Sequence, residues 1–194
     1  MKERLKHEIG RKAFHLLGIT VPIAYFLFGK YPALLYASLA LLGFVFLEFI
    51  RVRAHSFFPI SMSKAADFME RKSERTTVAA TVYFCVAAVI SIFFLNEKSV
   101  IIGLSAGLLS DTAAALFGVG LGKHPFSPGK TIEGTLAGMV VAAATAFLLS
   151  SGIVTAVALA LVFLVFDAVE LGIDDNFTIP LFMVLAAYFF EAIL

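Results

Sequence analysis

Residues 101–122 read IIGLSAGLLSDTAAALFGVGLG, an apolar run that one acidic residue, Asp111, interrupts. Apolar runs of about 18 residues or more are typical of helices that cross a lipid bilayer. Six further apolar blocks lie on either side of this run. The seven predicted spans are Ala13–Gly29, Pro32–Ile50, Thr76–Leu95, Ser99–Gly118, Thr131–Ser150, Gly152–Glu170 and Thr178–Leu194. The sequence therefore predicts an all-α, polytopic integral membrane protein with about seven transmembrane helices.

The composition of the whole chain supports this class. Hydrophobic residues make up 60% of the 194 residues and charged residues 15%, whereas soluble domains carry roughly a quarter charged residues. Because the spans leave little room for a soluble domain, we expect a single transmembrane domain over residues 1–194. The one cysteine, Cys85, lies within a predicted span and excludes a disulfide within the chain.

The distribution of Lys and Arg predicts the orientation. If the N-terminus is cytoplasmic and the spans alternate, thirteen of the fifteen Lys and Arg residues lie inside, and only Lys30 and Lys98 lie outside. Such an excess marks the cytoplasmic side of a membrane protein. The longest inner connection, residues 51–75, is expected to hold either a short helix at the membrane surface from Ser61 or an ordinary basic loop. The inner connections are longer and more polar, so any active site is expected to face the cytoplasm.

Asp111 is the first candidate for chemistry. It precedes the expected inner end of its helix by seven residues, which places it roughly 10 Å deep at about 1.5 Å per residue. A carboxylate at such a depth is costly and normally faces a polar cavity or a partner. Gly118 and Gly122 follow on the same side if the helix continues. A helix-packing surface, with Gly103 and Gly107 as a G-x-x-x-G pair, explains the glycines but not the aspartate.

The next connection, residues 122–135, reads GKHPFSPGKTIEGT. It is not a Walker A loop, because that pattern requires a glycine where His124 stands. Lys130 and Thr131 begin the following predicted span, and free N–H groups at a helix start attract anions. The connection therefore has the character of a phosphate site without the Walker geometry.

The charges around this connection extend the same hypothesis. Lys123 and Lys130 would supply cations beside the carboxylates of Asp111 and Glu133. Carboxylates and lysines near a helix start suit a complex of magnesium with a polyphosphate. In the simpler alternative, Lys130 only reaches the membrane surface and pairs with Glu133.

Two further clusters lie on the same predicted face. Residues 7–15, HEIGRKAFH, place four polar side chains on one helical stripe, namely Glu8, Arg11, Lys12 and His15. Residues 167–180, DAVELGIDDNFTIP, hold five oxygen-bearing side chains, namely Asp167, Glu170, Asp174, Asp175 and Asn176. Metal ligation and a cap on the last helix are both open explanations for the second cluster.

These motifs together resemble the signature of the CTP-dependent lipid kinases, the group of dolichol kinase, phytol kinase and yeast-type diacylglycerol kinase. Residues 111–135 are similar to the family's Asp, spaced glycines, Gly-Lys and Lys-x-x-Glu-Gly-Thr. The matching positions are Asp111, Ala114, Gly118, Gly122, Lys123, Lys130, Glu133, Gly134 and Thr135. The R-K-x-x-H at residues 11–15 and the DDNFTIP at residues 174–180 resemble two further elements of the family.

The resemblance implies an integral-membrane enzyme that transfers the γ-phosphate of CTP to an isoprenoid or glyceride alcohol at the cytoplasmic face. It implies Mg²⁺ as the cofactor, and CTP and a membrane lipid alcohol as partners. No nucleic-acid partner is expected, and a homo-oligomer is left open. Phosphoryl transfer needs alignment and charge neutralisation more than covalent help from the protein.

The resemblance also assigns roles to residues. The expected catalytic residues are Asp111, Lys130, Glu133 and His15, with His15 as the base for the lipid hydroxyl. The expected nucleotide-binding residues are Lys123, Lys130, Thr131, Gly118, Gly122, Arg11 and Lys12. The expected metal ligands are Asp111, Glu133, Asp174 and Asp175.

Two rival functions stay open. The distant relatives of the lipid kinases, the CDP-diacylglycerol synthases, transfer the cytidylyl group of CTP to a lipid phosphate. Their Lys-Asp and His-Gly-Gly elements are absent here, where the corresponding region reads ELGIDDNFTIP. This departure favours the kinase branch and leaves open a cytidylyltransferase of another subfamily, such as one that makes CDP-archaeol. A transporter is disfavoured, because the spans lack paired Gly/Pro-broken helices in corresponding halves.

Overall fold

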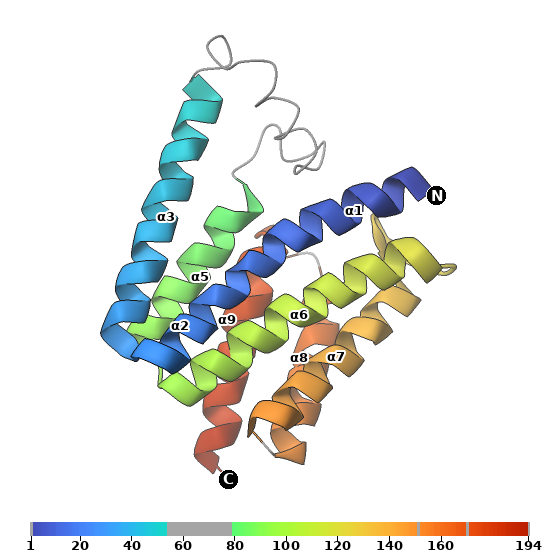
Figure 1. Cartoon of the computed structure of the whole chain (residues 1–194). Helices are drawn as coiled ribbons and strands as arrows, with labels where there is room; N and C mark the ends of the chain where they lie inside the picture. Colours follow the sequence, from blue (N-terminus) through green and yellow to red (C-terminus); the bar gives the residue numbers. More distant parts are fainter. Residues whose placement is uncertain (1, 54–78, 151, 170, 194) are drawn as a thin grey trace.

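A computed structural model of the chain describes residues 2–53, 79–150, 152–169 and 171–193 (Figure 1). The described residues are almost entirely helical, with one short hairpin. The elements are α1 (Lys2–His15), a 3₁₀ turn η1 (Leu16–Ile19), α2 (Thr20–Phe28), α3 (Lys30–Arg53), α5 (Ala80–Phe94), α6 (Glu97–Leu121), β1 (Pro125–Ser127), β2 (Lys130–Thr131), α7 (Ile132–Ser150), α8 (Ile153–Ala168) and α9 (Asp175–Ile193).

The all-α class is confirmed, and the protein has the helices of a membrane protein. Among the described residues, α3, α6 and α7 are long and apolar enough to cross a membrane, and α5 and α8 are shorter apolar helices. Each of the seven predicted spans overlaps described helix, while seven crossings stay a prediction. Most of the predicted connection 51–75, with the helix expected at Ser61, lies outside the described residues.

The first predicted span, Ala13–Gly29, is not one continuous α-helix. The chain passes from α1 through the 3₁₀ turn η1 into α2. Pro22 has no N–H to donate to the carbonyl of Gly18 four residues earlier, so a regular α-helical ladder is interrupted at that point. At Gly18 a Cβ atom would lie 2.8 Å from the ring of Phe84. The glycine therefore lets α5 pack closely against the turn.

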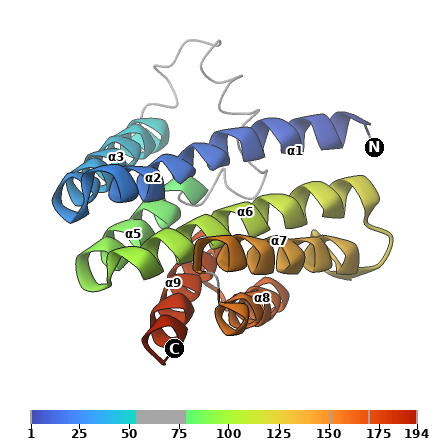
Figure 2. The same cartoon turned by 60° about the horizontal axis from the view of Figure 1, so that its bottom comes forward.

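Helix α6 is the centre of the fold. It packs against α7 and α9, and also against α1 and α2 (Figure 2). A Cβ atom at Gly103 would lie 2.3 Å from the backbone of Val184, and one at Gly107 would lie 3.1 Å from that of Pro180. The predicted packing surface of small residues is thus confirmed, and its partner is α9.

A two-stranded antiparallel hairpin joins α6 to α7. Strand β1 pairs with β2 in the register Pro125↔Thr131 and Ser127↔Lys130. Its turn contains Gly129 at φ 78°, a left-handed conformation that glycine adopts without steric cost. The hairpin folds Lys130 and Thr131 back over the C-terminal half of α6, where Asp111 is located.

Candidate active site

A polar pocket lies where the C-terminal half of α6 meets the hairpin, α7, α8 and α9. Small residues of α6 and α7 form part of its wall. The charged side chains that line it are Asp111, Lys130, Asp167 and Asp175. The cavity measures about 30 Å³, roughly the volume that one water molecule takes in the liquid. Four segments that are far apart in sequence therefore bring three carboxylates and one ammonium together.

Asp111 is held by two residues of the N-terminal helix. The ammonium of Lys12 donates to its Oδ2, and the Nε2 of His15 lies 3.3 Å from the same oxygen. Lys12 is only 1% exposed, so its charge depends on this carboxylate. The expectation that Asp111 faces a polar partner is confirmed. The structure also brings Lys12 and His15 to the edge of the predicted site.

Arg11 lies elsewhere. Its guanidinium pairs with Glu8 one turn earlier on α1, with Nη2 2.5 Å from Oε1, and both residues are buried. Neither of them lines the pocket. Of the four-residue stripe on α1, only Lys12 and His15 reach Asp111, because their positions on the helix face α6.

Lys130 reaches across the pocket to α8. Its Nζ lies 2.6 Å from the backbone oxygen of Asp167 and 3.2 Å from the Oδ1 of the same residue. The Oδ2 of Asp175 is 3.7 Å away. Lys130 therefore pairs with Asp167, whereas the simpler sequence alternative paired it with Glu133.

Asp167 is the residue that the assignment from sequence missed. Thr135, which is 4% exposed, donates from its hydroxyl to Asp167 Oδ2. The sequence placed Asp167 in an acidic cluster without giving it a role. The available signal was the one that identified Asp111, an aspartate inside an apolar segment. Glu170, the next acidic residue of that cluster, lies outside the described residues.

Glu133 is turned toward the connection between α6 and β1. Its carboxylate accepts hydrogen bonds from the backbone N–H groups of Lys123 and His124, at 3.1 and 3.3 Å, and lies 2.6 Å from His124 Nδ1. The side chain of Lys123 is exposed. Neither Glu133 nor Lys123 lines the pocket. The structure thus places this predicted metal ligand as an anchor of the loop.

Some of the backbone N–H groups at the start of α7 already donate hydrogen bonds within the protein. Thr131 Oγ1 accepts from the N–H of Gly134 at 3.2 Å, as an N-cap side chain does. The N–H of Ile132 donates to the carbonyl of His124. On α6, a Cβ atom at Gly118 or Gly122 would lie 3.2 or 2.7 Å from Thr131 Oγ1. These two glycines therefore let the hairpin approach α6 closely.

Asp174, which precedes α9, and Asp175, its first residue, make different contacts. Asp174 Oδ1 accepts from the backbone N–H of Asn176 at 2.9 Å and from its side-chain amide at 2.7 Å. These contacts are those of a helix cap. Asp175 instead lines the pocket. The helix-cap explanation from sequence thus fits Asp174, while Asp175 is the member available for ligand contact.

Two charged residues that precede the predicted spans have altered acidity. Burial lowers the pKa of the Lys12 ammonium, while the neighbouring charge of Asp111 opposes this shift. Burial also raises the pKa of the Asp175 carboxyl, and the charge of Asp111 acts in the same direction, against Lys130. The ionised form of Asp175 would therefore be favoured by any further cation in the pocket.

The expected metal ligands are only partly brought together. Asp111 and Asp175 line one pocket, whereas Glu133 and Asp174 are engaged outside it. Within the part of the chain that the structure describes, no three Asp, Glu, His or Cys side chains form a group that could hold a metal ion alone. Carboxylates are nonetheless the donors that hard cations such as Mg²⁺ prefer.

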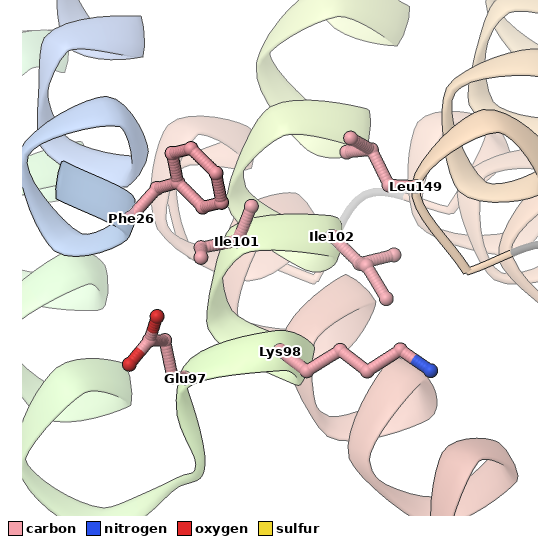
Figure 3. Close-up of a pocket in the computed structure, with 6 residues that line it drawn as sticks. All are labelled: Phe26, Glu97, Lys98, Ile101, Ile102 and Leu149. Atoms are coloured by element: carbon pink, nitrogen blue, oxygen red, sulfur yellow. The ribbon is translucent and has the colours of Figure 1, made fainter. Parts of the chain in front are cut away.

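A larger cavity lies near the other end of α6. It measures about 330 Å³ and is lined mainly by apolar side chains from α2, α6 and α7 (Figure 3). Two charged residues of the first turn of α6, Glu97 and Lys98, stand at its edge. Lys98 pairs with Glu191 of α9. This cavity contains none of the residues that the sequence assigned to chemistry.

The family model described as the cytidylyltransferase family matches residues 4–190, almost the whole chain. The chain belongs to the cytidylyltransferase family. No curated protein and no solved structure matches it. Membership supports a membrane enzyme that uses CTP in lipid chemistry, in agreement with the relationship to CDP-diacylglycerol synthases expected from the motifs. Both transfers considered above, that of the γ-phosphate and that of the cytidylyl group, consume CTP, so this family member fits either.

Proposed function

We propose that this member of the cytidylyltransferase family is a CTP-dependent lipid kinase. It transfers the γ-phosphate of CTP to the hydroxyl of a polyprenol, a phytol-type alcohol or a related lipid alcohol. The observation that carries this choice is the charge of the pocket, where three carboxylates face Lys130 and, beyond Asp111, the buried ammonium of Lys12, so that carboxylates still outnumber ammonium groups. A cytidylyltransferase must bind a lipid phosphate beside CTP, and more negative charge would be repelled there. A neutral alcohol adds none.

Lys130 is the residue proposed to contact the phosphates of CTP. It is the one cation that lines the pocket among the described residues, and charge-assisted hydrogen bonds to phosphate are strong. The cavity of about 30 Å³ can take only a small part of a nucleotide, so the phosphates are proposed to meet Lys130 at this pocket while the rest of CTP lies outside it. The small residues Gly118 and Gly134 let α6, α7 and the hairpin pack closely around this pocket.

Asp111 and Asp175 are the residues proposed to hold Mg²⁺. Mg²⁺ is usually bound through one or two carboxylates together with substrate phosphates, and not in a cage made by the protein alone. Asp111 and Asp175 line the same pocket, and among the described residues no group of three such side chains could hold a metal ion alone, which fits that mode. When bound, the ion would neutralise charge on the phosphates.

His15 is the residue proposed to accept the proton of the lipid hydroxyl. Its Nε2 faces Asp111 at 3.3 Å, so a proton on Nε2 can be shared with that carboxylate. The Nδ1 then remains unprotonated and can take up the hydroxyl proton. In this arrangement Asp111 also fixes the tautomer of His15.

The reaction itself is tested with CTP labelled separately at the α and γ phosphorus. The purified protein is incubated with each label and a free prenyl alcohol, and the lipids are extracted. We expect the γ label in the lipid fraction, with CDP as the released nucleotide. The same reaction without the alcohol is the control. Appearance of the α label in the lipid, release of pyrophosphate and a requirement for a lipid phosphate would overturn the kinase.

A second candidate is consistent with the same family membership. A lipid-phosphate cytidylyltransferase of the CDP-diacylglycerol or CDP-archaeol type would use the same pocket for CTP. It would also need cations for the phosphate of the acceptor, and Arg11, the nearest further arginine on α1, is already paired with Glu8. The label experiment separates the two candidates directly, because only the cytidylyltransferase transfers the α phosphorus.

A further inference from the structure

Asp167 offers Lys130 two different oxygens. The first is its backbone carbonyl, 2.6 Å from Lys130 Nζ. Helix α8 ends at Ala168, so Asp167 lies in its last turn. The carbonyl groups of the last turn have no N–H partner within the helix. The second is Oδ1 at 3.2 Å. The end of α8 thus provides a neutral and a charged acceptor for the same ammonium.

Asp167 is itself held in place. It is 7% exposed, and the buried hydroxyl of Thr135 donates to its Oδ2. This bond fixes the carboxylate so that Oδ1 faces Lys130. The resulting chain of contacts runs from α7 through α8 to the hairpin, and each of its members is buried or partly buried.

The geometry leaves one donor of Lys130 for a ligand. An ammonium has three N–H donors; one is donated to the backbone oxygen of Asp167, and the ion pair with Oδ1 at 3.2 Å can engage at most a second. The nearest further oxygen, Oδ2 of Asp175, is 3.7 Å away, beyond hydrogen-bond distance. The third donor can therefore be given to an incoming phosphate oxygen without breaking either contact to Asp167.

We propose that Asp167 is a positioning residue that fixes the ammonium of Lys130 at the pocket wall for contact with CTP, with Thr135 holding Asp167 in turn. The inference rests on the proposed function in that Lys130 binds the nucleotide. The flexible side chain of Lys130 is ordered before CTP arrives, so less conformational freedom is lost on binding. Asp167 need not touch the nucleotide to have this effect.

The test is a double-mutant cycle on CTP binding by the full chain in detergent. Labelled CTP is measured by equilibrium dialysis with Mg²⁺ and without a lipid acceptor, so that no turnover occurs. We expect Asp167→Asn to weaken binding about tenfold in the presence of Lys130 and less than about twofold in a Lys130→Ala background. Equal losses in the two backgrounds would overturn the inference, and would point to Asp167 as a direct ligand of the metal or the nucleotide.

Milder variants keep the inference testable if Asp167→Asn does not fold. Thr135→Val removes the hydroxyl and leaves both charges in place, so binding should weaken about threefold, whereas Thr135→Ser should restore it. The matched control is Thr155→Val, because Thr155 is also buried and donates to an acidic residue, Glu191, away from the pocket. Equal effects of Thr135→Val and Thr155→Val would overturn the inference.

The two proposals fail in different ways. If the α label enters the lipid while the cycle stays non-additive, the kinase assignment is wrong. The role of Asp167 then stands, because both kinds of enzyme bind CTP. If the γ label enters the lipid while the cycle is additive, the kinase stands and the positioning role of Asp167 is wrong.

Discussion

The cavities near the two ends of α6 differ in size and in the character of their walls. Near its first turn lies a cavity of about 330 Å³ with mostly apolar walls, whereas the cavity around Asp111 measures about 30 Å³ and has four charged residues in its wall. At the first end Lys98 and Glu191 form one ion pair, backed by a hydrogen bond from Thr155. At the second end carboxylates outnumber ammonium groups. The larger cavity is therefore mainly apolar, whereas the smaller one brings charged side chains together.

The two cavities also lie toward opposite predicted sides of the membrane. The residues around the large cavity come from ends of predicted spans assigned to the outside, and those of the polar pocket come from ends assigned to the cytoplasm. Alternating spans explain why each set lies together, because consecutive antiparallel helices bring every second connection to the same side. This agreement supports a multi-pass arrangement with a cytoplasmic site, which stays a proposal.

An all-or-none difference in accessibility is the largest effect expected. In a Cys85→Ala background, Lys123→Cys and Lys98→Cys each introduce one thiol, at the polar and at the apolar end respectively. A membrane-impermeant thiol reagent added outside intact cells should label position 98 and leave position 123 unlabelled. Permeabilised cells serve as the control for both positions. Labelling of position 123 from outside would invert the orientation derived from the Lys and Arg distribution.

The next largest effect is expected at the buried pair of the polar end. Asp111→Asn should lower turnover by at least about 100-fold, because it removes charge that the reacting groups require. It also leaves the buried ammonium of Lys12 unpaired, which destabilises the fold. Adding Lys12→Met should restore the melting temperature without restoring turnover. Stability and turnover are measured on the same detergent-purified samples.

The ion pair at the apolar end provides the matched control for Asp111. Lys98→Met together with Glu191→Gln should leave turnover within about twofold, since this pair lies near the other end of α6 from the polar pocket. If Asp111→Asn retained turnover within about threefold, equivalent to about 0.65 kcal/mol on the barrier, Asp111 would be a packing residue. The distinction between the two ends of α6 would then be lost.

A smaller effect is expected at Glu133, and it distinguishes an anchor from a metal ligand. If Glu133 only holds the loop through His124 and two backbone N–H groups, Glu133→Gln should lower turnover about fivefold. His124→Ala should have a similar effect, because it breaks the same contact. If Glu133 is a ligand of the metal, Glu133→Gln should abolish turnover and His124→Ala should not. The dependence of turnover on Mg²⁺ concentration should change only in the second case.

Much of the fold was predictable because its signals are local. Apolar runs such as residues 101–122 identify helices, since a backbone in lipid must satisfy its hydrogen bonds within the segment. The packing role of Gly103 and Gly107 also followed from spacing alone. The break in the first span was missed, although Pro22 is a local signal for it. The close packing of Phe84 on Gly18 is a tertiary contact that the apolar run does not reveal.

The candidate site was predictable in its centre and less so in its partners. Asp111 was predicted from its place within an apolar run and Lys130 from its place at the start of a helix, and both line the polar pocket. The assignment of Glu133 to the same metal as Asp111 rested on the charges around the connection and on the resemblance of residues 111–135 to the lipid kinases. The structure instead turns its carboxylate to His124, because the preceding connection folds back over the start of α7.

The sequence by itself determined the class of this protein, the centre of its site and its relation to CTP-using lipid enzymes. These properties depend on composition, on apolar run length and on motifs that are continuous in the chain. Only the tertiary structure decided which charges meet, namely Lys12 with Asp111 and Lys130 with Asp167. The members of these pairs stand 99 and 37 residues apart. The physical reason is that a charge inside a packed bundle of helices takes its partner from whichever helix packs beside it, and no pattern along the sequence specifies that neighbour.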